Sequence, residues 1–283
     1  MRFIKAFCII VALFALTSGA CSCNSKHNDI DDITSNISSE TEWENVESSS
    51  DDADIDSTFL ETESESEPID SNPFANVTMA CLGDSITMAT KVVDPYPTVV
   101  KNILGMQEVY NHGVSWSTLS YIDDCWCHPD SDYNHDPYVF RYDELEDADI
   151  IAIMGGVNDW GCLIPIGDLD DVVPTTFYGA LNILITQLKA DHPDSYIFMM
   201  TGFDYYDVEK VDAYNRDKVY WREFNEAIVA VCEKYDIDCF DVFHEVPVNR
   251  DVDMIDGTHP TQEFINNVWA PMIADFIREN YEK

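Results

Sequence analysis

Positively charged side chains are scarce in this chain. Only 15 Lys and Arg stand against 54 Asp and Glu among 283 residues, which gives a formal net charge of −39 at pH 7. Such a charge repels the phosphates of nucleic acids and the headgroups of anionic membranes, so the sequence predicts neither as a partner. The chain also lacks an internal repeat, which argues against a repeat architecture.

A hydrophobic run of membrane-spanning length is missing from the N-terminus. The apolar run Ala6–Leu16 is too short to cross a bilayer comfortably. Basic residues precede it and small residues follow at positions 18–20, as in an export signal. We therefore expect residues 1–20 to be a signal peptide and the mature protein to be extracellular, either secreted or anchored at a bacterial cell surface. Cys21 resembles the lipidated first residue of a bacterial lipoprotein, although Ser18 replaces the usual Leu and ordinary cleavage before Cys21 would leave the same mature end.

Apolar residues are few in the segment that follows, residues 21–72. Positions 24–72 hold 16 acidic residues against one lysine. A chain of low hydrophobicity and high charge cannot bury enough surface to offset its conformational entropy. We expect a disordered, acidic tether rich in Ser and Thr, which spaces a domain of residues 73–283 from the cell surface.

From Pro73 onward, apolar runs of strand length alternate with helical segments. This alternation predicts an α/β fold in which a parallel sheet is covered by helices on both faces. About 210 residues suffice for one sizeable core. The expected strands are Val77–Leu82, Glu108–Tyr110, Asp149–Met154, Tyr196–Thr201 and Asp238–Phe243, and the expected helices are Tyr96–Leu104, Thr176–Ala190, Val219–Tyr235 and Gln262–Tyr281.

Four short motifs lie just after the predicted strands or in the loops that follow them. In open α/β sheets, ligands bind beyond the carboxyl ends of the strands, so we expect the motifs to form one site. They are GDSIT at Gly83–Thr87, NHGVS at Asn111–Ser115, GGVND at Gly155–Asp159 and DGTHP at Asp256–Pro260.

The first and last motifs supply the residue types of a serine hydrolase. A serine hydroxyl such as that of Ser85 needs a base to remove its proton, and His259 can serve as that base. Asp256 stands three residues before His259, a spacing that lets it accept a hydrogen bond from one ring nitrogen; Asp251 and Asp253 are more distant alternatives. Taken alone, each motif also has a purely structural interpretation: Ser85 could cap a helix, and Asp256 could form an Asx turn before the last helix.

Gly113 and Asn158 are candidates for an oxyanion hole. A glycine in the loop after the second strand can present an unobstructed backbone N–H, and the Asn158 amide can donate toward the same point. The alternatives are a turn glycine and a strand-capping asparagine.

In their order and spacing, these motifs resemble the four blocks of the SGNH (GDSL-type) hydrolase superfamily over residues 76–283. The resemblance implies a three-layer α/β/α sandwich with a flavodoxin-like, five-stranded parallel sheet of order 2-1-3-4-5. It also implies ester hydrolysis without a metal or another cofactor. By carry-over, Ser85 is the nucleophile, His259 the base and Asp256 its orienting partner. The Ser85 N–H, the Gly113 N–H and the Asn158 amide form the oxyanion hole.

Two small departures, Ile86 and Val157, touch no catalytic group. A larger one is the insertion Trp116–Asp147, which is rich in aromatic residues. Aromatic rings beside an active site suit stacking on sugars, so we expect Trp116 and Trp160 to bind substrate. The alternative is that these rings pack a long loop.

Six cysteines follow the tether: Cys81, Cys125, Cys127, Cys162, Cys232 and Cys239. Their pairing cannot be deduced from spacing. We expect Cys81, in the first strand, to be a free core thiol, and Cys125 or Cys127 to pair with Cys162. Cys125, Cys127 and His128 have donor types suited to a metal, but a second pair at the usual spacing is missing, so we predict none.

The sequence therefore predicts an exported serine esterase that forms an acyl-enzyme. The expected substrate is a small ester or an acetylated polysaccharide, and the acetyl group on a polysaccharide fits best. A lipid or lysophospholipid acyl hydrolase is one alternative, and a surface carbohydrate-binding module without activity is another.

Overall fold

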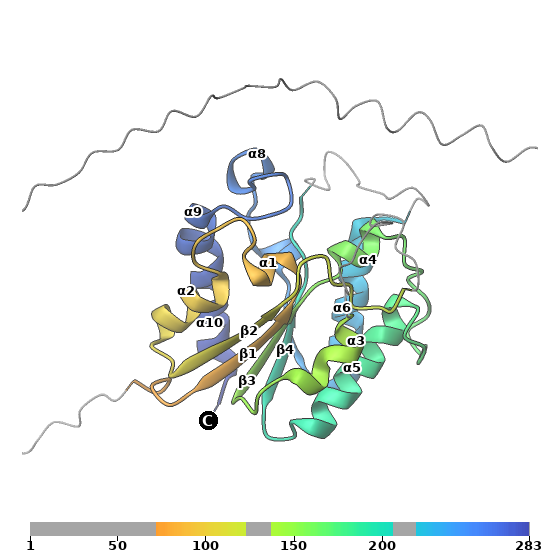
Figure 1. Cartoon of the computed structure of the whole chain (residues 1–283), viewed down its shortest axis with the longest axis horizontal. Helices are drawn as coiled ribbons and strands as arrows, with labels where there is room; N and C mark the ends of the chain where they lie inside the picture. Colours follow the sequence, from red (N-terminus) through yellow and green to blue (C-terminus); the bar gives the residue numbers. More distant parts are fainter. Residues whose placement is uncertain (1–71, 123–136, 206–218, 283) are drawn as a thin grey trace, which may run out of the picture. The chain divides into compact units, whose positions relative to one another are not determined.

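The computed structural model describes residues 72–122, 137–205 and 219–282 of the chain (Figure 1). These residues contain a sheet of five parallel strands in the order β2-β1-β3-β4-β5, which confirms the predicted fold class and strand order. The strands are β1 (Thr78–Gly83), β2 (Glu108–Gly113), β3 (Ile150–Met154), β4 (Tyr196–Met200) and β5 (Asp238–Phe240).

The register of the sheet brings the ends of three strands level with one another. Gly83, the last residue of β1, pairs with Gly113 of β2 on one side and with Met154 of β3 on the other. The loops that follow these strands therefore begin at the same edge of the sheet. The short helices α1 (Ser85–Met88) and α4 (Val157–Gly161) both lie at this edge, at the top of Figure 1.

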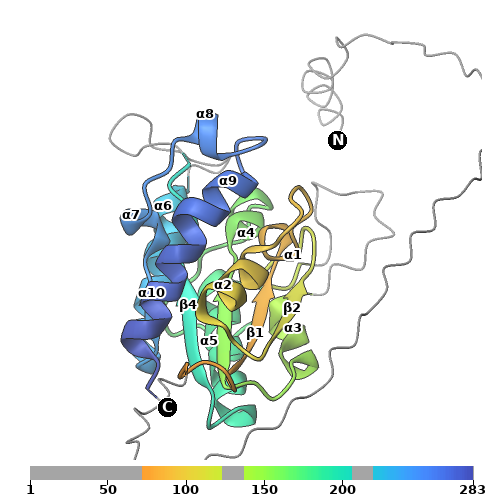
Figure 2. The same cartoon turned by 90° about the vertical axis from the view of Figure 1, so that its left-hand side faces the viewer.

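Helices cover both faces of the sheet. On one face lie α2 (Tyr96–Leu104) and α10 (Ala270–Asn280), which are in front in Figure 2. On the other lie α3 (Tyr138–Arg141), α5 (Phe177–Asp191) and α6 (Trp221–Tyr235). The remaining elements are the 3-10 turn Tyr142–Glu144, α7 (Val242–Glu245), α8 (Arg250–Asp253), α9 (Gln262–Phe264) and the π-helical segment Ile265–Trp269. None of the described helices is both long and apolar enough to cross a membrane.

The core occupies both interfaces between the helices and the sheet. All five residues of β3 are buried, as expected for a central parallel strand. On one face, the rings of Tyr96 and Trp269 lie 4.5 Å apart. On the other face, Phe177 and Phe224 lie 4.7 Å apart. Burial of such aromatic side chains contributes strongly to stability and fixes the helices against the sheet.

Two predicted strands were wrong by three residues at their C-terminal ends. The strand expected at Asp238–Phe243 ends at Phe240, and α7 begins at Val242. The Phe243 N–H donates to Thr201 Oγ1 at 2.9 Å, so this apolar segment is buried as a helical turn rather than as strand. The strand expected at Glu108–Tyr110 extends to Gly113, because its pairing with β1 continues through the motif itself.

The last predicted helix, Gln262–Tyr281, is interrupted. Its middle, Ile265–Trp269, is a π-helix in which the Ala270 N–H donates to the Ile265 carbonyl five residues earlier. Pro271 follows at the start of α10. Since proline has no N–H and its ring crowds the preceding turn, the widened turn accommodates it.

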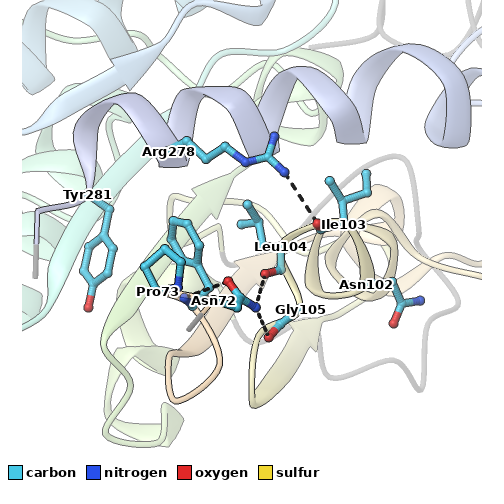
Figure 3. A pocket seen from close by; sticks show the side chains of 9 residues that line it. Asn72, Pro73, Asn102, Ile103, Leu104, Gly105, Arg278 and Tyr281 are labelled. Atoms are coloured by element: carbon cyan, nitrogen blue, oxygen red, sulfur yellow. Dashed lines mark hydrogen bonds between the residues drawn. The ribbon is translucent and has the colours of Figure 1, made fainter. Parts of the chain in front are cut away.

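A cavity of about 610 Å³ lies between the helices α2 and α10 (Figure 3). It is lined by the C-terminal ends of α2 and α10 and by the residues before β1, and the Asn72 side chain donates to the carbonyls of Leu104 and Gly105 there. Both helices run against the strand direction, so their C-terminal ends lie at the amino ends of the strands. The cavity is therefore remote from the predicted active site.

Candidate active site

Ser85 stands at a sharp junction between a strand and a helix. It is the first residue of α1, two positions after β1 ends. The side chain of Asp84 caps this helix, because its Oδ1 accepts the Ile86 N–H at 2.9 Å. The helix-capping role considered for Ser85 therefore belongs to its neighbour Asp84. Ser85 is 9 % exposed.

Asp256 and His259 share one tight loop between α8 and α9. The Ile255 N–H donates to the His259 carbonyl at 2.8 Å and closes the loop. Gly257 has a φ of +83°, a conformation that residues with a side chain seldom adopt. This turn lets both functional side chains leave the loop on the same side.

The structure brings the predicted serine, histidine and aspartate together. His259 Nε2 lies 2.9 Å from Ser85 Oγ, although the two residues are 174 positions apart in the sequence. His259 Nδ1 lies 3.0 Å from Asp256 Oδ1 and 2.9 Å from its Oδ2. The tautomer that satisfies both contacts carries its proton on Nδ1 and leaves Nε2 free to accept the serine proton.

The carboxylate of Asp256 is held in its charged form. Partial burial alone would raise its pKa, but hydrogen bonds from the backbone N–H and the ring of His259 lower that pKa below its ordinary value. The Thr258 N–H, at 3.2 Å from Oδ1, acts in the same direction. Lys91 Nζ is 3.9 Å from Oδ2. A carboxylate fixed in this way can orient the imidazole and stabilise its protonated form.

Gly113 is required by a close approach of two backbones. A Cβ at this position would lie 2.1 Å from the Met88 nitrogen of α1. The Gly113 N–H donates to Asn111 Oδ1 at 2.9 Å, and the Asn111 amide donates to the Thr87 carbonyl at 2.7 Å. The second motif is thus bound to the helix that carries the serine, while the oxyanion role of Gly113 stays a prediction.

Asn158 lies in α4, behind the serine loop, and is buried. Its amide nitrogen is 3.0 Å from the Ser117 carbonyl and 3.4 Å from Asp84 Oδ2. The Asn158 side chain therefore joins the loop after β2 to the turn that carries Ser85. Its predicted donation to an oxyanion likewise stays a prediction.

Residues 81–264 match the GDSL-like lipase/acylhydrolase family. The chain belongs to this family. It is therefore a hydrolase of ester bonds, which disfavours the alternative of a binding module without activity. The family match spans all four motifs.

Solved structures share the fold of this GDSL-like hydrolase. A protein from Lactobacillus plantarum is 24 % identical, with a TM-score of 0.61, over 73 % of this chain and 99 % of the other. A possible lipase from Chitinophaga pinensis is 19 % identical, with a TM-score of 0.55, over 72 % and 98 %. The inhibitor-bound aryl esterase of M. smegmatis is 17 % identical, with a TM-score of 0.53, over 72 % and 100 %. No curated protein matches the sequence.

Two buried carboxyl groups lie beneath the active site of this hydrolase. Burial raises the pKa of Asp84 to about 7; the Ile86 N–H opposes this shift and the neighbouring Asp159 adds to it. Burial also raises the pKa of Asp159 to about 6, against the N–H groups of Leu119 and Ser120. Those two N–H groups lie 2.8 and 2.9 Å from the Asp159 oxygens. Asp159 thus anchors helix α4 to the loop after β2.

The raised pKa of Asp84 predicts how stability changes with pH. The folded state holds the Asp84 proton up to about pH 7, whereas an unfolded Asp loses its proton near pH 3.8. The protonated Asp84 therefore stabilises the folded state at low pH, and this stabilisation is lost as the pH rises from 3.8 to about 7. We expect Asp84→Asn to gain about 2–3 kcal/mol in unfolding free energy relative to the native protein between pH 5 and pH 8. Urea denaturation at several pH values measures this difference. Asp194→Asn, an exposed control, should keep the native pH slope, and an equal slope in both variants would contradict the prediction.

The two tryptophans predicted to bind substrate are placed differently. Trp116 lies in the loop after β2 with a φ of +68° and is 48 % exposed. Trp160 is partly buried: its Nε1 donates to the Val219 carbonyl at 3.0 Å, and its ring lies 5.9 Å from that of Trp221. Trp116 is therefore exposed in the loop after β2, whereas Trp160 packs α4 against the start of α6.

Among the described residues, Cys81, Cys232 and Cys239 are free thiols. Cys81 is buried in β1, as predicted, and burial raises its pKa far above the ordinary value. Cys162 and Cys232 are buried and Cys239 is partly buried. The predicted partners of Cys162, Cys125 and Cys127, lie outside the described residues, as does His128. Among the residues that are described, no group of three His, Cys, Asp or Glu side chains could hold a metal ion.

Proposed function

We propose that this hydrolase cleaves its ester through an acyl-enzyme on Ser85. The observation that carries the proposal is the 2.9 Å contact between Ser85 Oγ and His259 Nε2, with Asp256 on the other ring nitrogen. In the first step, Ser85 Oγ attacks the ester carbonyl while His259 accepts the serine proton. His259 then returns that proton to the departing alcohol, and the acyl group remains on Ser85.

The second half of the reaction repeats the first with water as the nucleophile. His259 removes a proton from the water, the hydroxide attacks the acyl carbonyl, and the carboxylic acid leaves as Ser85 recovers its proton. The ionised Asp256 stabilises the imidazolium in both halves. One water is consumed, and one acid and one alcohol are released.

Three donors would stabilise the negative oxygen of each tetrahedral intermediate: the Ser85 N–H, the Gly113 N–H and the Asn158 amide. The Asn158 amide can turn from its longer contact, the one of 3.4 Å to Asp84 Oδ2, toward the developing oxyanion. Gly113 would have to exchange its contact with Asn111 Oδ1. Loss of one such donor typically lowers the rate by about 100- to 1000-fold.

For the natural substrate, we favour acetyl groups on carbohydrates, hydrolysed outside the cell. The export-like N-terminus and acidic tether would place the domain at or beyond the cell surface. The Asp256 side chain is 39 % exposed and that of His259 is 17 % exposed, whereas Ser85 is 9 % exposed, so a substrate would reach Ser85 from the side of the loop that carries Asp256 and His259. Trp116 is 48 % exposed and precedes Ser117, whose carbonyl accepts the Asn158 amide, and aromatic rings stack well on sugar rings.

A lipid or lysophospholipid acyl group is the second candidate. Several exposed aliphatic side chains flank the triad in the sequence: Met88, Val93, Val252 and Ile255. Val93 lies beside the start of α9, because its N–H donates to Gln262 Oε1. Such side chains could contact a long acyl chain.

A series of chromogenic esters with acyl chains of 2 to 12 carbons separates these candidates. For an acetylesterase we expect kcat/KM to be highest for the acetate and to fall steeply beyond four carbons. A maximum at eight or more carbons would replace the carbohydrate proposal with the lipid one.

The proposed stacking of a sugar ring on Trp116 leads to a separate prediction. We expect Trp116→Ala to lower kcat/KM on an acetylated polysaccharide by up to about tenfold, because a lost ring contact is worth up to about 1.5 kcal/mol, while kcat/KM on a small chromogenic acetate changes little. Phe140→Ala, which removes an aromatic ring of similar exposure from α3, is the control. If Trp116→Ala left the ratio of kcat/KM between the polysaccharide and the small acetate unchanged, stacking of the substrate on Trp116 would be excluded.

A further inference from the structure

Arg141 is a buried arginine in the insertion between the second and third motifs. It ends helix α3 and is 3 % exposed. Removing a guanidinium from water costs several kcal/mol unless its N–H groups find acceptors. The contacts of Arg141 therefore indicate what this buried charge does.

The guanidinium donates to three oxygens at the edge of the sheet that carries the active site. Nη1 donates to the His112 carbonyl at 2.9 Å, and Nη2 donates to the Gly83 carbonyl at 3.1 Å. Nη2 is also 3.2 Å from Ser117 Oγ. Gly83 ends β1 two residues before Ser85, and His112 lies next to the end of β2. One planar group thus links two strand ends to the loop that follows β2.

Ser117 extends this link to the asparagine of the third motif. Its carbonyl accepts the Asn158 amide at 3.0 Å while its hydroxyl contacts Arg141. A continuous chain of hydrogen bonds therefore runs from the strand that leads to Ser85, through Arg141 and Ser117, to the Asn158 side chain.

The helix that carries Arg141 is itself fixed to the same edge. Tyr138 OH donates to the Met154 carbonyl at the end of β3 at 2.9 Å, and the Arg141 guanidinium lies 5.2 Å from the Tyr138 ring. The Tyr138 N–H donates to the Thr118 carbonyl, one residue after Ser117. Helix α3, which carries Arg141, is therefore held both to the end of β3 and to the loop after β2.

We propose that Arg141 is a positioning residue for ester hydrolysis, which sets the Asn158 amide relative to Ser85 through Ser117. The proposal rests on the function proposed above for Ser85 and Asn158. Lysine keeps the charge but cannot reach three acceptors with a planar fork, so it should loosen the arrangement. A displacement of about 1 Å in such a site can lower the rate by about 100-fold.

The test compares Arg141→Lys, Arg141→Met and the control Arg222→Met on α6. Titration with a fluorophosphonate counts the reactive serines, and kcat per reactive serine and KM are then measured on a chromogenic acetate. We expect Arg141→Lys to lower kcat by about 10- to 100-fold with KM within about threefold, Arg141→Met to lose more, and the control to match the native enzyme. A native kcat per reactive serine in Arg141→Lys would overturn the proposal.

A double-mutant cycle with Ser117→Ala tests the link directly and needs no variant that lacks the positive charge. If Arg141 acts through Ser117, the double variant Ser117→Ala/Arg141→Lys should lose little more than Arg141→Lys alone. Additive losses would contradict the proposed path. Retention of full activity by Ser85→Ala would instead reject the serine mechanism, whatever the Arg141 variants show.

Discussion

Replacement of Ser85 by alanine is expected to lower kcat/KM on a chromogenic acetate by at least about 10⁴-fold. The variant loses the only oxygen that His259 Nε2 contacts at 2.9 Å among the described residues, and with it the atom that would carry the acyl group. Loss of the catalytic serine of a protease that uses serine, histidine and aspartate lowers kcat by about 10⁶-fold, with a remainder due to the oxyanion donors and substrate binding. Steady-state kinetics on purified protein measures the loss, and fluorophosphonate labelling should vanish with it.

The matched control is Thr98→Ala, which removes one hydroxyl from helix α2. This variant should keep native kinetics and labelling. If Ser85→Ala kept native labelling and turnover, another residue would be the nucleophile and the contact between Ser85 and His259 would not be catalytic. Equal losses in both variants would point to a defect in folding rather than in chemistry.

The sheet could be predicted because each strand is an apolar run that ends at a turn. In β3, the residues Ile150–Met154 are apolar throughout and are all buried. Local pattern could not determine where β5 ends, since Val242 and Phe243 are as apolar as a strand requires. Their helical turn depends on Thr201, which is remote in sequence and accepts the Phe243 N–H. The π-helical turn before Pro271 was missed for a similar reason, because helical periodicity alone does not distinguish it.

The convergence of Ser85, Asp256 and His259 could be predicted from parallel-sheet topology together with the family resemblance. The hydrogen-bond partners of the proposed oxyanion donors could not. Asn158 meets Ser117, and Gly113 meets Asn111, through contacts that depend on the loop after β2. Arg141 was also missed, although a single arginine within the otherwise apolar and aromatic run Tyr138–Tyr142 is a usable sign of a buried charge with a specific task.

Replacement of Asp256 by asparagine should have the second-largest effect, a loss of about 10⁴-fold in kcat. The native carboxylate accepts from His259 Nδ1 at 2.9 Å, so it selects the tautomer in which Nε2 is free to act as a base. An asparagine amide can donate to Nδ1 instead and favour the opposite tautomer, with Nε2 protonated. The hydrogen bonds from His259 hold the pKa of Asp256 below its ordinary value, so the carboxylate is ionised from pH 5 to pH 9. Steady-state kinetics of the native enzyme and of Asp256→Asn across this pH range therefore compare a charged with a neutral hydrogen-bond partner of His259.

Asp251 provides the control for this prediction, because it lies in the adjoining helix α8 and was an alternative partner for His259. Asp251→Asn makes the same chemical change a few residues away and should leave kcat within about twofold of the native value, as expected for an exposed substitution. Asp253 is a poorer control because its carboxylate accepts the Asn249 N–H at 2.7 Å. If Asp251→Asn lost activity and Asp256→Asn did not, His259 would take its orientation from a different carboxylate in the reacting enzyme. The loop would then have to rearrange on substrate binding, since His259 is already within hydrogen-bond distance of both Ser85 and Asp256 in the free protein.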